Sequence, residues 1–186
     1  MAAIREGNKT ALLIVDVQVG VVKEAWHTAQ VVKNINLAVE KARAAGIPII
    51  WVQHADEELI SGSPEWQLVP ELSPAEGDLH IYKGYNSSFE ETALEEVLAD
   101  LGITHVVLAG AATNWCIRAT AYAALDRGYD LTLIKDAHTT EMMEFQDGTI
   151  IEADSIIRDL NVAMTWLSYP GRSTSALPAV ELDFPG

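Results

Sequence analysis

Short apolar runs alternate with helical patterns along most of the chain. Residues 11–18 form a continuous apolar run of strand length that ends in polar residues, as expected for a strand buried on both faces. From about Ala29 to Ala45 apolar residues recur at helical spacing, and Gly46 and Pro48 then stop the helix. The β-branched segment Ile47–Gln53 predicts a second strand.

The middle of the chain contains one long segment without a period. Residues 57–73 are expected to form an irregular loop that shapes a pocket. A third, short strand is predicted at Leu79–Tyr82. After it, Ser88-Phe-Glu-Glu91 has the spacing of a capping box, which predicts a helix from there through Leu101.

The strand and helix patterns continue to residue 167. They predict a strand at Thr104–Ala109, a tight turn at Gly110–Asn114, a helix at Trp115–Arg127, a strand at Tyr129–Ile134, a helix at Ile150–Leu160 and a sixth strand at Ala163–Leu167. This alternation is typical of an α/β fold, a three-layer, doubly wound, Rossmann-like domain. Its sheet would have six mainly parallel strands with helices on both faces.

Length and composition place all of this in one domain. The chain has 186 residues, and 49% of them are hydrophobic, enough to cover a parallel sheet on both faces. We therefore predict one domain over residues 1–186, in which residues 170–186, rich in proline and glycine, form an extended C-terminal arm. The arm suggests packing against a neighbouring subunit, and hence a homo-oligomer.

Net charge and cysteine content limit the classes of binding partner and the cellular compartment that we expect. The net charge of -15 opposes binding to nucleic acid or to anionic lipid. No apolar run reaches the length of a membrane span, and the N-terminus lacks the apolar core of a signal peptide. A single cysteine forms no internal disulfide and fits a reducing compartment, so we expect a cytoplasmic protein that acts on a small molecule.

Candidate chemistry lies where the predicted strands end, because ligands of open α/β sheets bind beyond the carboxyl ends of the strands. The residues at these ends are Asp16, His54, Lys83, Cys116 and His138. Cys116 falls in the first turn of its helix, which favours the thiolate and predicts a lowered pKa. Lys83 would stabilise that thiolate, and Asp16 would accept the thiol proton.

Each of these residues also has a structural interpretation. A lone cysteine is often a small buried apolar residue, an aspartate that ends a strand often caps a loop, and a lysine is usually solvated. Their joint presence at one sheet edge favours the functional interpretation.

The chain resembles the isochorismatase-like cysteine hydrolases, which include nicotinamidases, N-carbamoylsarcosine amidases, ureidoacrylate amidohydrolases and streptothricin hydrolases. The resemblance covers nearly the whole chain. It rests on the segments Leu-Leu-Ile-Val-Asp16-Val-Gln, Lys83-Gly-Tyr-Asn-Ser-Ser-Phe89, Gly110-Ala-Ala-Thr-Asn-Trp-Cys116 and Gly128-Tyr-Asp-Leu-Thr-Leu-Ile-Lys-Asp136-Ala.

The resemblance implies a catalytic triad of Asp16, Lys83 and Cys116 and hydrolysis of a carbon–nitrogen bond through a thioester, without a cofactor. It also implies a cis peptide bond between Ala111 and Ala112, and an oxyanion hole formed by the backbone N–H groups of Ala112 and Cys116. The substrate would be an amide, a lactam or a ureido compound. Family habit agrees with a dimer or tetramer.

Aromatic residues near the predicted site suggest the walls of a pocket. Trp26, Tyr85 and Trp115 lie next to triad strands or loops, although aromatic residues more often belong to a core. Nicotinamidases bind zinc with an Asp-x-His pair near the second strand, but His54-Ala-Asp56 has the reverse order here. We therefore expect no metal.

Two other functions remain open at this point. Some isochorismatases hydrolyse a vinyl ether and can lack the cysteine. A non-catalytic flavodoxin-like domain that binds a ligand or senses redox state would place a reactive thiol at the same edge, but it would need neither Asp16 nor Lys83. Nucleotide binding is disfavoured, because no glycine-rich phosphate loop follows the first strand.

Overall fold

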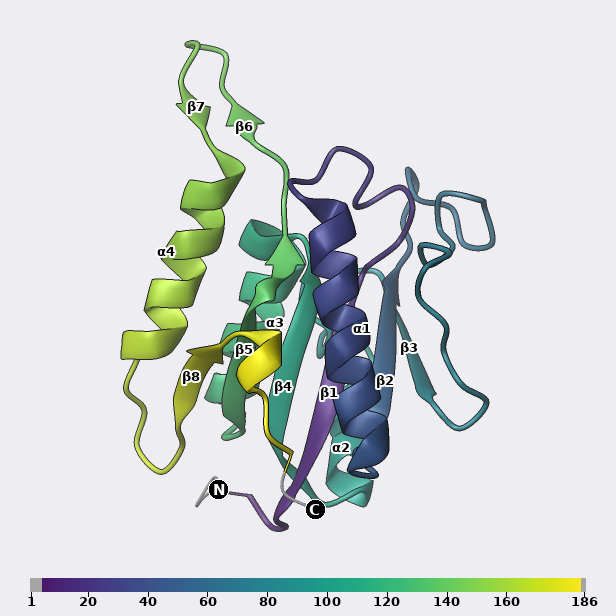
Figure 1. The fold of residues 1–186 in the computed structure, drawn as a ribbon, viewed down its shortest axis with the longest axis vertical. Helices are drawn as coiled ribbons and strands as arrows, with labels where there is room; N and C mark the ends of the chain where they lie inside the picture. Colours follow the sequence, from purple (N-terminus) through teal and green to yellow (C-terminus); the bar gives the residue numbers. More distant parts are fainter. Residues whose placement is uncertain (1–4, 185–186) are drawn as a thin grey trace.

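A parallel six-stranded sheet forms the centre of the computed structural model, which describes residues 5–184 (Figure 1). The strand order is β3-β2-β1-β4-β5-β8, and every neighbouring pair is parallel. The strands are β1 (Lys9–Val15), β2 (Ile49–His54), β3 (Leu79–Lys83), β4 (Ile103–Ala111), β5 (Asp130–Thr139) and β8 (Thr174–Leu177). The predicted α/β fold is confirmed.

Helices cover both faces of the sheet. They are α1 (Thr28–Ala44), α2 (Leu94–Asp100), α3 (Arg118–Asp126) and α4 (Ala153–Trp166), together with the short turns η1 (Thr113–Ile117) and η2 (Ala179–Glu181). Helix α1 and η2 pack in one apolar core with side chains such as Leu12 and Ile14, whereas α2, α3 and α4 share the other core with Leu13 and Val15. Alternate residues of β1 thus serve opposite faces.

Strand order makes the site possible. The chain leaves β1 towards β2 on one side and leaves β4 towards β5 on the other, so the connections diverge between β1 and β4. This is the switch point at which α/β sheets bind ligands. Gly110 lets the strands approach there, since a Cβ atom on it would lie 1.9 Å from the carbonyl oxygen of Val15.

The sixth strand is not where the sequence predicted it. Residues 163–166 of the segment Ala163–Leu167 belong to α4, in which Leu160 and Met164 are buried and Trp166 is exposed. The strand is instead β8, inside the segment expected to be an extended arm, and it pairs with β5. Residues 185–186 of that segment lie outside the described part.

Two further boundaries differ from the predictions. The Ser88–Glu91 segment caps no helix: the Ser88 N–H donates to Thr120 Oγ1, and α2 begins only at Leu94. The helix predicted from Trp115 is divided into the π-turn η1 and α3.

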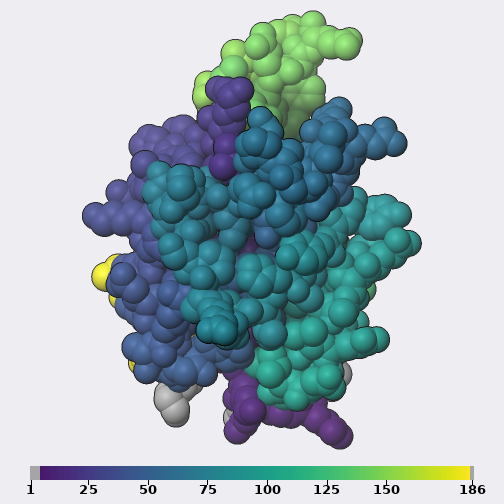
Figure 2. All heavy atoms as spheres, turned by 90° about the vertical axis from the view of Figure 1, so that its right-hand side faces the viewer, coloured from purple at the N-terminus to yellow at the C-terminus, as the bar shows by residue number. Residues whose placement is uncertain are grey.

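Two long connections follow the carboxyl ends of β5 and β2: one protrudes from the surface and the other covers part of it. The strands β6 (Met143–Glu144) and β7 (Ile150–Ile151) form a hairpin that rises above the rest of the surface (Figures 1 and 2). The segment of residues 55–78 spreads over the face shown in Figure 2 and has no helix or strand of its own, as expected for its central part. Within residues 5–184 no helix is long and apolar enough to cross a bilayer.

Candidate active site

The structure brings together three of the predicted site residues at the switch point. Asp16 follows β1, Lys83 ends β3, and Cys116 lies in η1 after β4. The Lys83 Nζ atom lies 2.6 Å from Asp16 Oδ2 and 3.3 Å from Cys116 Sγ. An ammonium group therefore lies between a carboxylate and a thiol.

The ion pair between Asp16 and Lys83 is shielded from solvent. The side chains of Asp16 and Lys83 are both fully buried, whereas Cys116 is only partly buried. Asp16 also has a left-handed backbone (φ 52°), a conformation that is uncommon for non-glycine residues and is enriched at functional sites. The residue that carries this carboxylate therefore has an unusual backbone conformation.

The ionisation states differ from the expectation for Cys116. Burial and the nearby Asp16 raise the pKa of Cys116 to about 12, although Lys83 acts to lower it. The prediction of a lowered thiol pKa was wrong, because loss of solvation and a neighbouring carboxylate outweigh the short turn on which the cysteine lies. Burial also raises the pKa of Asp16, against the opposing effect of Lys83.

The turn that carries Cys116 has the expected backbone. The Ala111–Ala112 peptide bond is cis, as the resemblance implied. Residues 113–117 then form the π-turn η1, in which the N–H groups of Trp115 and Ile117 both donate to the Ala112 carbonyl.

His138 lies beneath this turn and not in the open site. It is 1% exposed, and its Nδ1 atom lies 2.9 Å from Thr113 Oγ1 while its Nε2 atom lies 3.0 Å from Asn161 Oδ1. Because Asn161 donates its Nδ2 to the Lys135 carbonyl, its Oδ1 accepts from His138 Nε2–H. His138 Nδ1 therefore accepts from the Thr113 hydroxyl, and burial lowers the His138 pKa to about 4.

Sequence reasoning missed several residues that hold the loops of the site together. Gln18 is buried two positions after Asp16, and its side-chain amide bonds both the N–H and the carbonyl of His54 as well as the Trp66 carbonyl. Thr140 Oγ1 donates to Asn114 Oδ1, and the Trp26 N–H donates to the Thr140 carbonyl. Gln18, in the motif after the first strand, gave the only sequence signal.

The three predicted aromatic residues are each about half exposed. Tyr85 contributes its carbonyl oxygen, 3.1 Å from Lys83 Nζ. Trp115 directly precedes Cys116, whereas Trp26 lies further along the chain from Asp16 and stacks on His27, with ring centroids 3.8 Å apart. Their exposure leaves all three rings accessible to a ligand.

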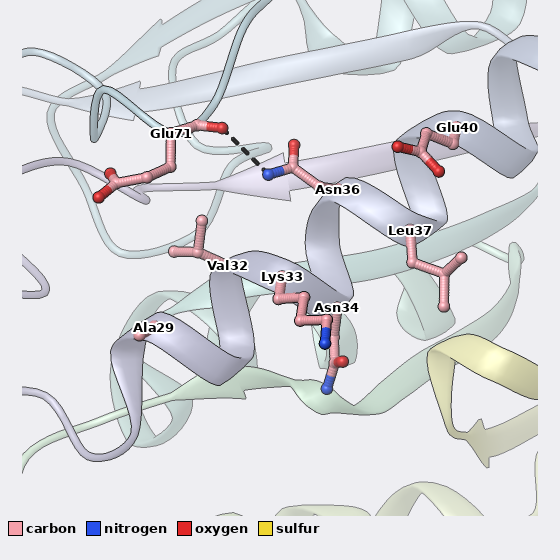
Figure 3. A pocket seen from close by; sticks show the side chains of 8 residues that line it. All are labelled: Ala29, Val32, Lys33, Asn34, Asn36, Leu37, Glu40 and Glu71. Carbon is pink, nitrogen blue, oxygen red and sulfur yellow. Dashed lines mark hydrogen bonds between the residues drawn. The ribbon is translucent and has the colours of Figure 1, made fainter.

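A separate groove lies on the outer side of α1 and holds no triad residue. It has a volume of about 430 Å³, and two of its lining residues are joined by a hydrogen bond from the Asn36 side-chain amide to the Glu71 backbone carbonyl (Figure 3). Its lining includes Val32 and Leu37 but none of Asp16, Lys83 and Cys116.

The described residues contain no group of three His, Cys, Asp or Glu side chains that could hold a metal ion. His54 lies 2.9 Å from Asp56, and His80 is exposed on β3. The absence of a metal remains an expectation.

Comparison with known proteins identifies the family. A ureidoacrylate amidohydrolase of Klebsiella pneumoniae is 31% identical over 172 residues, covering 70% of this chain and 73% of that protein. A streptothricin hydrolase of Streptomyces noursei is 32% identical and covers 75% of this chain and 57% of its own length. The crystal structure of an isochorismatase from Pseudomonas putida has a TM-score of 0.84 at 28% identity, covering 95% of this chain and 93% of that one. Since the isochorismatase domain model also matches residues 10–160, this chain belongs to the isochorismatase family of hydrolases.

Proposed function

We propose that this protein is a cysteine-dependent amidohydrolase that cleaves a carbon–nitrogen bond of a small amide, lactam or ureido compound through a thioester on Cys116. The observation that carries the proposal is the position of Lys83 Nζ between Asp16 and Cys116 Sγ. The ureidoacrylate amidohydrolase and streptothricin hydrolase among the relatives support an amide-type substrate.

The first half of the reaction forms the thioester. Asp16 accepts the proton of Cys116 while Sγ attacks the substrate carbonyl, and its raised pKa makes it a stronger base than an exposed carboxylate. The ammonium of Lys83 balances the charge that develops on sulfur. When the carbon–nitrogen bond breaks, the proton passes from Asp16 to the leaving nitrogen, and the amine departs.

The second half returns the enzyme to its starting state. Water attacks the thioester and gives a proton to Asp16, the acid is released, and the proton returns to the Cys116 thiolate. In both halves the carbonyl oxygen becomes an anion. The N–H groups of Ala112 and Cys116, at the two ends of the nucleophile turn, are the proposed donors, each contributing about 3 kcal/mol.

The accessible aromatic rings supply the proposed binding surface. Trp26, Tyr85 and Trp115 would contact the flat faces of a cyclic or planar substrate. Their partial exposure supports this role, since side chains of a closed core would be buried.

The proposal is tested with a panel of amides, lactams, ureido acids and vinyl ethers, assayed with the wild type and Cys116→Ala. We expect turnover of one nitrogen-containing class by the wild type only, and a covalent acyl mass on the rapidly quenched wild-type protein. Because Cys116 is the only cysteine, the mass shift has one thiol to report. Hydrolysis by Cys116→Ala at the wild-type rate, for an amide or a vinyl ether, would overturn the proposal.

A further inference from the structure

Lys83 has a neighbour that belongs to no predicted triad. Its Nζ atom lies 3.5 Å from His54 Nδ1, in addition to its contacts with Asp16, Cys116 and the Tyr85 carbonyl. The parallel register of β2 and β3 pairs His54 directly with Lys83, so the sheet itself builds this contact. An ammonium group only donates, hence the imidazole nitrogen facing it must be an acceptor.

The far side of the imidazole is held by Asp56. The His54 Nε2 atom lies 2.9 Å from Asp56 Oδ2, while Asp56 Oδ1 accepts the N–H groups of Glu58 and Leu59 at 2.9 and 2.7 Å. The Leu59 N–H first, and then the His54 side chain, hold the pKa of Asp56 below its usual value. An ionised Asp56 accepts from Nε2–H, which leaves the Nδ1 lone pair pointing at Lys83.

The backbone of His54 is also fixed. Gln18 bonds its N–H at 2.8 Å and its carbonyl at 3.0 Å. Asp56 therefore orients the imidazole ring, and Gln18 fixes the backbone that carries it. Supporting hydrogen bonds of this kind hold a functional side chain in one orientation.

We propose that His54, oriented by Asp56, is a positioning residue that directs the ammonium of Lys83 towards Asp16 and Cys116. The proposal rests on the proposed function, since Lys83 acts there on the nucleophile. The Lys83 ammonium has three N–H donors and four neighbouring acceptors. When the sulfur of Cys116 becomes part of a thioester and accepts less strongly, the N–H group that pointed at sulfur can donate to His54 instead. His54 holds the ammonium in place until the thiolate returns.

This role requires a neutral imidazole. The charged groups around His54 are Asp56 on one side and Lys83 with Asp16 on the other. Protonation of Nδ1 would place a second positive charge against Lys83 and remove the acceptor.

Alkylation of Cys116 tests the inference without a substrate. Intact-protein mass gives the rate of reaction with iodoacetamide as a function of pH for the wild type, His54→Gln and His54→Asn. The asparagine oxygen replaces Nδ1 in position, whereas glutamine reaches towards Asp56 and leaves Lys83 without this acceptor. We expect His54→Gln to react roughly tenfold more slowly than the wild type, as for loss of a hydrogen bond to a charged group. His54→Asn should retain most of the rate.

Matched variants complete the experiment. His80→Asn, on the neighbouring strand, and Glu57→Gln, beside Asp56, should leave the rate unchanged. Equal rates for the wild type and His54→Gln, with equal melting temperatures, would overturn the inference even if amide hydrolysis is found. A His54-dependent rate in a protein that hydrolyses no amide would instead retain the inference and count against the proposed function.

Discussion

The surroundings of Cys116 favour its thiol form. Burial raises the pKa of both Cys116 and Asp16, and each resists becoming charged beside the other. Lys83 has one positive charge, and it lies closer to the carboxylate than to sulfur. In the proposed reaction, the proton would therefore leave sulfur only as sulfur attacks the substrate carbonyl.

Replacement of Asp16 by asparagine should separate reactivity from turnover. The negative charge of Asp16 raises the Cys116 pKa, so Asp16→Asn should lower it and increase the alkylation rate near neutral pH by roughly tenfold or more. Hydrolysis should be lost, because no base remains to accept and return the proton. Asp147→Asn, on the exposed hairpin, is the control. A slower alkylation of Asp16→Asn would contradict this account.

At the scale of elements, one buried histidine connects the turn η1, which carries Cys116, to helix α4. His138 on β5 joins Thr113 of η1 to Asn161 of α4. Both of its ring nitrogens are occupied in the neutral form, so a proton on Nδ1 would break the bond to Thr113 and place a charge in the core.

This link predicts loss of stability in acid. The His138 pKa falls from about 6.5 in the unfolded chain to about 4 in the folded protein. Its contribution is therefore complete above pH 6.5 and is lost as the pH falls from there towards 4, by about 3 kcal/mol in total. Urea unfolding at several pH values measures the change. The slope should be smaller in His138→Gln and unaltered in His80→Asn, and equal slopes in all three proteins would contradict the assignment.

The elements that sequence predicts well are those with buried, continuous apolar runs. The strands at Lys9–Val15 and Ile103–Ala111 and the helix at Thr28–Ala44 lie within a few residues of their predicted positions. The strand prediction fails for Ala163–Leu167, because a short, mostly apolar run of five residues also fits the last turn of a helix. Strand β8 has no strong apolar signal; Ser173, just before it, instead bonds Asp130 at the start of β5.

The site was predictable where motif and strand end coincide, as at Asp16, Lys83 and Cys116. It was not predictable where contacts depend on which residues of neighbouring strands pair with one another. The neighbours of Lys83 depend on the β2–β3 register, and the burial of His138 depends on an irregular pairing of β4 with β5. Neither register is visible in the residues themselves. The thiol pKa was mispredicted for the same reason, since the degree of burial follows from packing.

At the scale of the whole molecule, the loops at the carboxyl edge of the sheet are strongly acidic. Apart from Asp16, the acidic residues of segments 16–27, 55–69, 84–93, 112–117 and 140–152 are Glu24, Asp56, Glu57, Glu58, Glu65, Glu90, Glu91, Glu141, Glu144, Asp147 and Glu152. Lys23 is the only lysine or arginine of these segments. A negative potential at this edge of the sheet repels anions and attracts cations.

Substrate charge should therefore affect the rate of capture. Among amides of equal size, one that carries an ammonium group should have a kcat/KM roughly tenfold above that of one that carries a carboxylate. The difference should shrink at high ionic strength, because salt screens exposed charges. A neutral amide of the same size is the control and should respond little to salt. A preference for the carboxylate at low salt would show that a local contact dominates.

The protonation state of Cys116 should also affect how readily the protein is oxidised. Peroxide attacks thiolates, and a sulfenic acid is normally rescued by a second cysteine that forms a disulfide with it. This chain has no second cysteine. Burial and the nearby Asp16 raise the pKa of the Cys116 thiol to about 12, so we expect the thiol to react slowly with peroxide. The carboxylate that keeps Cys116 protonated should thus also slow its oxidation.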